Sequence, residues 1–418
     1  MFQRKLILAT LSLGIATPIL AGGLMAPFSL PSAKVLPKGV RNITYKGIYL
    51  QGNNKFSNSG QKVALGDSFN SDLTFQDLVE NESTESAQAS AAALIQSLGY
   101  DLNQGIGGST GKLNVAVNTH TPIIAYGISK KLTGAIAIPI ISSKTSVDVG
   151  SVSNNTFQGA IDKATLSGYG NISKAAEIQK KYANATNNKI SDYGYKPLEN
   201  ESKTELGDVK LVAKYQLVNK PLYRLSLDGT TTLPTGREKD VNKVVDVASG
   251  DGQSDIGLGL SGDFHLSSKF TLSAAASYTA QLKDSEELRI PIKEDSQLSP
   301  DIDPNVRRNL GDIIATHAGG SVSIFEALSF GTAYSYQRKS ADSYEGTLYS
   351  SERYGWLSKN SKQEMHSILA SISYDTISAY RKKKFAIPME ATLNYSHVLQ
   401  GKNVISDPVT TFDLKIYF

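Results

Sequence analysis

The chain of 418 residues has no cysteine and a single tryptophan. Without cysteine it has no disulfide, no Cys-ligated zinc or iron–sulfur site and no lipid-modified N-terminal cysteine. The chain also has no large excess of charge of one sign, since it contains 43 Lys and Arg and 39 Asp and Glu. No nucleic-acid partner is therefore expected. Beyond residue 30 there is no apolar run of about 18 residues, which excludes a later membrane helix. With a mean hydropathy of −0.22, composition alone predicts a soluble protein.

The order of the residues at the N-terminus predicts export. A basic start (MFQRK) precedes an apolar run of about 15 residues and a small residue, Ala21, as in secretory signal peptides. We expect a signal peptide over 1–21, with cleavage after Ala26 and an uncleaved N-terminal anchor as alternatives. Residues 22–39 contain prolines and predict an irregular periplasmic lead-in that could enter the interior of the fold.

The C-terminus predicts an amphipathic strand. Residues of the last strand alternate, so that one face carries only apolar side chains: Phe412, Leu414, Ile416 and Phe418. A terminal strand ending in Phe resembles the C-terminal signal of outer-membrane β-barrels. The resemblance implies a membrane-insertion signal and contact with the barrel-assembly machinery during insertion.

The same alternation recurs along the chain. It is clearest at 270–283, 385–395 and 255–266, where apolar residues occupy every second position and polar residues the others. Segments of about ten residues with this pattern are typical of transmembrane β-strands. The predicted strands are 40–51, 112–128, 132–146, 206–218, 222–234, 254–266, 269–283, 312–324, 328–338, 363–377, 384–398 and 407–418.

The connections between these twelve strands alternate between short and long. Short turns such as 129–131 and 267–268 follow long gaps such as 52–111 and 147–205. This regularity predicts an all-β, membrane-spanning, antiparallel up-and-down barrel over 40–418, with long extracellular loops and both termini in the periplasm. A soluble β-sandwich would show similar alternation but needs no apolar outer face on every strand. Outward tyrosines near strand ends suit an interfacial girdle, although tyrosine also favours strands in general.

The inward face is predicted to carry mixed charge, which gives no strong ion selectivity. About twelve strands leave a bore between a filled and an open barrel, which opposing charges or a loop could plug. Two inward prolines, Pro139 and Pro388, predict local kinks in their strands, because proline removes a ladder hydrogen bond. The predicted lumen-lining residues are Lys46, Asp208, Lys210, Lys214, Arg224, Asp228, Asp255, Asp263, His265, His317, Asp375, Glu390, Asp413 and Lys415.

Three stretches resemble known motifs, but none of them predicts an enzymatic or metal site. The G-x-G-x-x-G match at 257–262 lies within a predicted strand rather than before a helix, so small lumen-facing residues are expected there. The Gly-rich stretch 105–112 departs from a phosphate loop and predicts a flexible loop. Residues 301–312 resemble a calcium loop but lack its Gly and its final Glu, so an acidic loop is expected, with a loosely held divalent ion as the alternative. No catalytic residue, metal site or cofactor is predicted.

The two longest loops carry helical patterns at 75–98, after a possible cap at Thr74, and at 173–185. Such helices could cap the mouth, fold into the bore or decorate the surface.

Four stretches carry a family resemblance: 206–215 (LGDVKLVAKY), 233–236 (LPTG), 250–255 (GDGQSD) and 126–140 (YGISKKLTGAIAIPI). They resemble outer-membrane transporters of the meta-pathway phenol-degradation family, which is distantly similar to the long-chain fatty-acid transporters. The resemblance implies uptake of small hydrophobic or aromatic solutes. In the fatty-acid transporters a strand break opens a lateral exit to lipid, and the prolines extend that hypothesis to this chain.

We therefore expect a passive channel or transporter, rather than an enzyme, in the outer membrane of a Gram-negative bacterium. Its expected partners are outer-membrane lipid, lipopolysaccharide and a small hydrophobic solute. A lipid-acting barrel enzyme and a surface adhesion or structural barrel are the alternatives.

Overall fold

The computed structural model describes residues 29–80, 84–167 and 190–418, apart from 295 and 297. The predicted signal peptide over 1–21 and the predicted helix over 173–185 lie outside the described residues. None of the described helices is long and apolar enough to cross a membrane.

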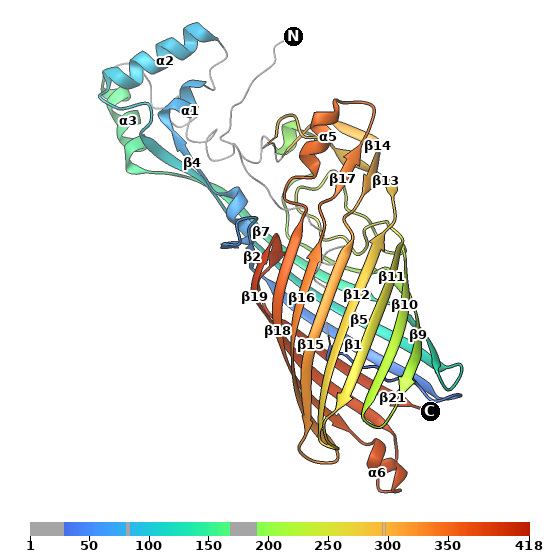
Figure 1. Cartoon of the computed structure of the whole chain (residues 1–418). Coiled ribbons are helices and arrows are strands. Elements are labelled where there is room, and N and C mark those ends of the chain that lie inside the picture. The colour runs from blue at the N-terminus through green and yellow to red at the C-terminus, as the bar shows by residue number, and fades with distance from the viewer. Residues whose placement is uncertain (1–28, 81–83, 168–189, 295, 297) are drawn as a thin grey trace.

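The chain forms a closed antiparallel β-barrel of 12 strands, as the sequence predicts (Figure 1). The barrel closes because the first strand pairs on one side with the last strand and on the other with the next strand along the chain. Neighbours around the wall are mostly consecutive in sequence, so the topology is up-and-down. The wall strands are β1 Arg41–Gly52, β5 Gly105–Gly127, β6 Leu132–Ala137, β9 Val209–Asn219, β10 Tyr223–Leu233, β11 Asp255–His265, β12 Phe270–Gln281, β15 Ile313–Ser323, β16 Leu328–Lys339, β18 Gln363–Asp375, β19 Met389–Lys402 and β21 Val409–Tyr417.

The period of two in the sequence determines which side chains face outward. In β12, Leu272 and Tyr278 are exposed, while Gln281 at the end of the strand is buried. Leu258 on β11 lies opposite Tyr278, so neighbouring strands present apolar residues at one level. The G-x-G-x-x-G stretch 257–262 lies inside β11 and is followed by no helix.

Two predicted strands are interrupted at the same level of the wall. The predicted strand 132–146 corresponds to β6 and the first half of β7 (Ile140–Ser153). The predicted strand 206–218 corresponds to β9, and it is preceded by β8 (Glu201–Leu206), which lies in the predicted loop 147–205 except for its last residue. β6 pairs with β9, whereas β7 pairs with β8. The interruptions fall at Pro139, which cannot donate a ladder hydrogen bond, and at Gly207.

The long connections form two structures at one end of the barrel. The first is an arm, in which β5 and β7 extend beyond the barrel and carry β4 (Ser71–Thr74) and three helices (Figure 1). Its own core includes Phe75, Ile106 and Phe157. The predicted helix 75–98 is two helices, and the predicted flexible loop 105–112 is instead the first part of β5, paired with β7. The arm helices are α1 Phe75–Glu80, α2 Glu85–Ser97 and α3 Asn155–Leu166.

The second structure is a cap over the mouth of the barrel. Three strands form a small sheet, and Ile290, Val306 and Tyr354 pack together as the core of the cap. The acidic residues of the calcium-like stretch have other roles, since Asp303 accepts a hydrogen bond from Tyr354 and Asp301 pairs with Arg353 at 2.6 Å. The cap elements are β13 Asp284–Arg289, β14 Ile302–Asn309, β17 Ser343–Glu345 and α5 Ser351–Leu357. A further small sheet lies beside η1 (Leu65–Phe69) and consists of β2 Asn54–Phe56, β3 Lys62–Ala64 and β20 Val404–Ile405.

The opposite end of the barrel has short turns and one short helix, α6 (Ile377–Arg381), between β18 and β19 (Figure 1). Pro388 lies immediately before β19 and not within it, so the predicted kink at this residue is wrong. Its carbonyl accepts a hydrogen bond from the Tyr417 backbone N–H. At this position before the strand, the N–H that proline lacks is not needed by the ladder.

Candidate functional site

Residues 29–38 lie inside the bore and are called the plug below. Ala33 is fully buried, and its backbone N–H donates to Oδ2 of Asp263 at 3.0 Å. Its carbonyl accepts hydrogen bonds from Gln216 and Ser226, which project inward from β9 and β10. The plug has no regular secondary structure, so inward side chains of the wall satisfy backbone groups that would otherwise stay unpaired.

Further contacts fix the plug along its length. Nζ of Lys214 donates to the Ser32 carbonyl at 2.5 Å, and Nζ of Lys46 donates to Oγ of Ser29 at 3.0 Å. Leu30 packs against Ala333 and Leu369 of the wall. Gly331 allows this approach, because a Cβ there would lie 2.3 Å from Cδ1 of Leu30.

Around the plug, several of the charged residues that were predicted to line the lumen form pairs of opposite charge. Lys46 pairs with Asp413 at 3.5 Å, and Lys415 pairs with Glu390 at 2.7 Å near the short-turn end. Such pairing leaves little net charge in the bore. The other predicted residues lie on further strands of the wall: Arg224 opposite Asp263, Asp228 opposite Lys214, Asp255 opposite Gln281, His317 opposite Ser335, Asp375 opposite Glu390, Lys210 opposite Thr232 and His265 bonded to Thr271, with Asp208 between β8 and β9.

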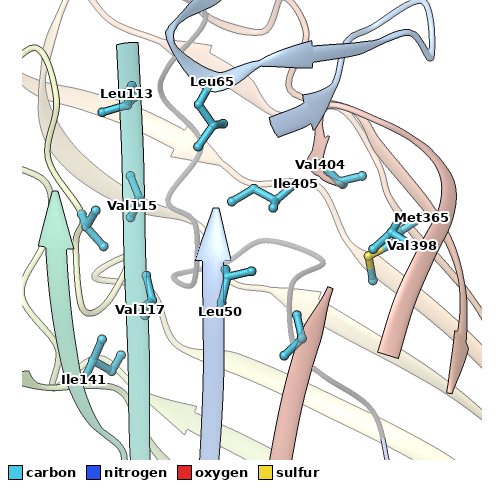
Figure 2. Packing of buried hydrophobic residues seen from close by; sticks show 12 residues of the cluster. Leu50, Leu65, Leu113, Val115, Val117, Ile141, Met365, Val398, Val404 and Ile405 are labelled. Atoms are coloured by element: carbon cyan, nitrogen blue, oxygen red, sulfur yellow. The ribbon is translucent and has the colours of Figure 1, made fainter. Parts of the chain in front are cut away.

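Above the plug, the end of the bore near the cap is apolar. Buried side chains of β1, β5, β7, η1, β18, β19, β20 and β21 converge there with loop residue Val247, as Figure 2 shows for most of them. We call this set the upper cluster. It includes Val115, Val117 and Ile141, each less than a tenth exposed. Its members are Leu50, Leu65, Leu113, Val115, Val117, Ile141, Val247, Met365, Val398, Val404, Ile405 and Val409.

The upper cluster reaches the interruption in the wall. Ile141 follows Pro139 by two residues, and an added Cβ at Gly207 would lie 2.9 Å from Cδ1 of Ile141 and 3.0 Å from Cγ of Pro139. Any side chain at Gly207 would therefore collide with both. The glycine keeps the two broken strands in contact where the ladder stops.

Side chains replace the backbone ladder beyond this point. β8 pairs with β7 on one side, and on its other side it faces the loop 235–250; this boundary is called the seam. Oγ1 of Thr235 donates to the Gly207 carbonyl at 2.8 Å and accepts from the Val209 N–H at 3.0 Å. Oδ1 of Asp208 accepts from the Gly236 N–H at 2.9 Å.

Ion pairs continue the seam along β8. The alternating residues Glu201, Lys203 and Glu205 point toward the loop, where Lys243, Asp246 and Arg237 respectively pair with them. Arg237 also pairs with Asp246 at 2.7 Å. Burial by itself would raise the pKa of the Asp246 carboxyl, but hydrogen bonds from Arg237, from the Asp240 backbone and from Lys203 outweigh it and hold the pKa well below its usual range.

The chain is similar to a known channel in fold. No protein-family model and no curated protein matches its sequence. An outer membrane channel from Pseudomonas putida F1 is similar over 94% of this chain and 100% of its own, with a TM-score of 0.53 and 11% identity. A toluene transporter from Ralstonia pickettii covers 92% of this chain and 90% of its own, with a TM-score of 0.36 and 12% identity.

The fold is that of an outer-membrane β-barrel. The exposed apolar side chains on the outer wall agree with this, because in lipid only a closed barrel pairs every backbone group of its strands. Aromatic residues frame the apolar band. Tyr334 and His366 contact each other near the cap end, and Tyr223 and Tyr374 are exposed near the other end.

Two parts of this site are not predicted by the sequence. The alternating opposite charges of Glu201, Lys203 and Glu205 fall inside a predicted loop rather than a strand. Gly207 belongs to the stretch 206–215, and no local pattern marks it as a contact between strands. The plug was anticipated as a segment that could enter the bore, yet its partners on β9, β10 and β11 could not be identified without the register.

Proposed function

We propose that this outer-membrane barrel is a passive uptake channel for small hydrophobic or aromatic solutes. The observation that carries the proposal is the upper cluster, an apolar lining beneath the cap and directly above a polar, plugged bore. Apolar solutes favour such surfaces over water by about 25 cal/mol per Å² buried.

The route out of the upper cluster follows from what blocks the bore. The plug and its bonds to Asp263, Gln216 and Ser226 obstruct the straight path to the periplasm. The regular ladder of the wall is interrupted beside Pro139 and Gly207, where one backbone bond, from the Gly207 N–H to the Pro139 carbonyl at 2.8 Å, and the Thr235 side chain hold the strands. A solute in the upper cluster would leave sideways through the seam, as the resemblance to fatty-acid transporters implies, while a hydrophilic solute would need the plug to move.

The remaining partners follow from this placement. Lipid and lipopolysaccharide would surround the exposed outer wall, and the assembly machinery would recognise the terminal strand β21 during insertion. No enzymatic role is proposed. The ring contacts of His120, His265 and His366 are to Tyr45, Thr271 and Tyr334 rather than to a serine nucleophile.

A charge placed in the upper cluster tests the proposal. Val117→Asp should abolish the channel-dependent uptake of toluene across the outer membrane of intact cells, because a carboxylate buried among apolar side chains repels the solute or draws in water. Single-channel conductance of the same variant should stay within about twofold of the wild type. Val152→Asp on the arm, where the valine is 57% exposed, is the matched control and should leave uptake unchanged. Equal toluene uptake by wild type and Val117→Asp would refute the proposal.

A second candidate function is surface adhesion, because the arm projects beyond the barrel and its own hydrophobic core gives it a defined fold (Figure 1). Shortening only α2, from Glu85 to Ser97, separates the two functions: uptake should persist, whereas an adhesin should lose binding to its partner. Deletions reaching residue 105 would remove part of β5 and could not be interpreted in this way.

A further inference from the structure

The short-turn end of the barrel carries a strong excess of positive charge. The turns 128–131, 220–222, 266–269 and 324–327, together with the longer turn 376–388, have only one carboxylate among them, Glu326. We call these turns the periplasmic rim. Their basic residues are Lys130, Lys131, Lys220, Lys269, Arg381, Lys382, Lys383 and Lys384.

Half of that charge lies in the β18–β19 turn, whose backbone is well fixed. After α6, Lys383 adopts a left-handed conformation with φ of 58°. Its N–H donates to the Tyr380 carbonyl at 2.9 Å, and the Lys384 N–H donates to the Ala379 carbonyl at 2.8 Å. This pair of bonds is a Schellman-type helix end, so it presents the basic residues from a defined scaffold.

The charge of this turn is not neutralised within the protein. Lys382 pairs with Glu326 of the neighbouring turn, and Nζ lies 2.6 Å from both carboxylate oxygens. Among the residues that the structure describes, no carboxylate lies within ion-pair distance of Arg381, Lys383 or Lys384, and all three are exposed. An external anion can therefore reach them.

Apolar side chains accompany the basic residues. Tyr380, Phe385 and Ile387 of the same turn are each more than 40% exposed, and Phe325 of the adjacent turn is 68% exposed. Aromatic and aliphatic residues next to cations are typical of surfaces that lie at the boundary of a bilayer. A soluble acidic partner would give no reason for this exposed apolar set.

We propose that the β18–β19 turn is a binding surface for the phosphate headgroups of anionic phospholipid in the periplasmic leaflet. Arg381, Lys383 and Lys384 would contact the phosphates, while Tyr380 and Phe385 would enter the acyl-chain boundary. The inference rests on the membrane placement of the barrel and not on which solute it carries. A failure of toluene uptake therefore leaves it untouched.

The test is native mass spectrometry of delipidated, folded full-length protein with added phosphatidylglycerol or phosphatidylethanolamine. The variant Arg381→Gln/Lys383→Asn/Lys384→Gln removes the charge and keeps the turn, because asparagine tolerates the left-handed conformation. Each basic residue near a bilayer surface adds about fivefold in affinity, so the variant, which lacks three of them, should bind phosphatidylglycerol on the order of 100-fold more weakly. The control variant carries three substitutions at the opposite end: Arg307→Gln/Lys359→Gln/Lys362→Gln.

The wild type and the control variant should prefer phosphatidylglycerol, and the preference should fall with added salt. Retained heat-resistant mobility on gels shows that each variant is folded. Equal phosphatidylglycerol binding by the wild type and the rim variant would overturn the proposal, as would equal binding of both lipids by the wild type. Displacement of bound phosphatidylglycerol by polyglutamate at matched charge concentration would overturn it in favour of a soluble acidic partner.

Discussion

Removing one carboxylate should loosen the plug. Oδ2 of Asp263 accepts the Ala33 N–H, while Oδ1 accepts a hydrogen bond from Ser273 at 2.9 Å, so the carboxylate is held in place by the wall. A hydrogen bond to a charged group contributes about 1.5–3 kcal/mol. Because about 1.4 kcal/mol corresponds to a tenfold change in an equilibrium, Asp263→Ala should raise the open fraction of the bore about 10- to 100-fold.

Single-channel recording in planar bilayers measures this open fraction directly. Asp255→Ala is the matched control, because it removes an inward carboxylate from the same strand, and Asp255 has no contact with the plug among the described residues. We expect frequent large openings in Asp263→Ala alone. An unchanged open probability in Asp263→Ala, or an equal rise in both variants, would show that the bond does not hold the plug.

Three further predictions follow from the packing, the seam and the terminal strand. Gly331→Ala should displace the leucine of the plug and increase channel openings, whereas Gly229→Ala, which meets no atom within 4 Å, should not; equal openings would contradict the packing. Asp246→Asn leaves two cations without their buried partner, costs about 3 kcal/mol and should speed tryptic cleavage of the loop 235–250. In the wild type, the Asp246 carboxylate stabilises the folded state fully at any pH above the ordinary carboxyl pKa. This stabilisation is lost only as the pH falls through the depressed pKa of the folded state. Protection of that loop should therefore not change between pH 8 and pH 5, and a loss near pH 6 would be inconsistent. Phe418→Ala should lower the yield of heat-resistant barrel, while Phe325→Ala, at similar exposure on a turn, should not.

The wall of the barrel was predictable because its chemistry is local. A strand with lipid on one side must alternate with a period of two, and that pattern is visible in 270–283, which contains β12, although the mean hydropathy of the chain hides it. The break at Pro139 was also visible, because proline removes a hydrogen-bond donor wherever it lies in a strand. Pro388 shows the limit of this reasoning, since β19 begins at Met389 rather than at the predicted residue 384, which places the proline outside the strand.

The arm and the cap could be predicted only in part. The helical pattern at 75–98 was correct in type, but the sequence did not show that β5 begins at Gly105 rather than near residue 112. The glycine-rich composition of that stretch favours a loop by propensity. Pairing with β7 overrides the propensity, and only the tertiary structure supplies that partner.

The sequence by itself determined the fold class, the number of strands, the orientation of each face and the position of the wall break at Pro139. These depend on side-chain periodicity and on proline chemistry, which act over a few residues. The tertiary structure decided that residues 29–38 fill the bore, that Glu201, Lys203 and Glu205 close the seam, and that apolar side chains of distant strands meet above the plug. These contacts join residues up to hundreds of positions apart, and their partners depend on strand register and barrel closure, which no local pattern encodes.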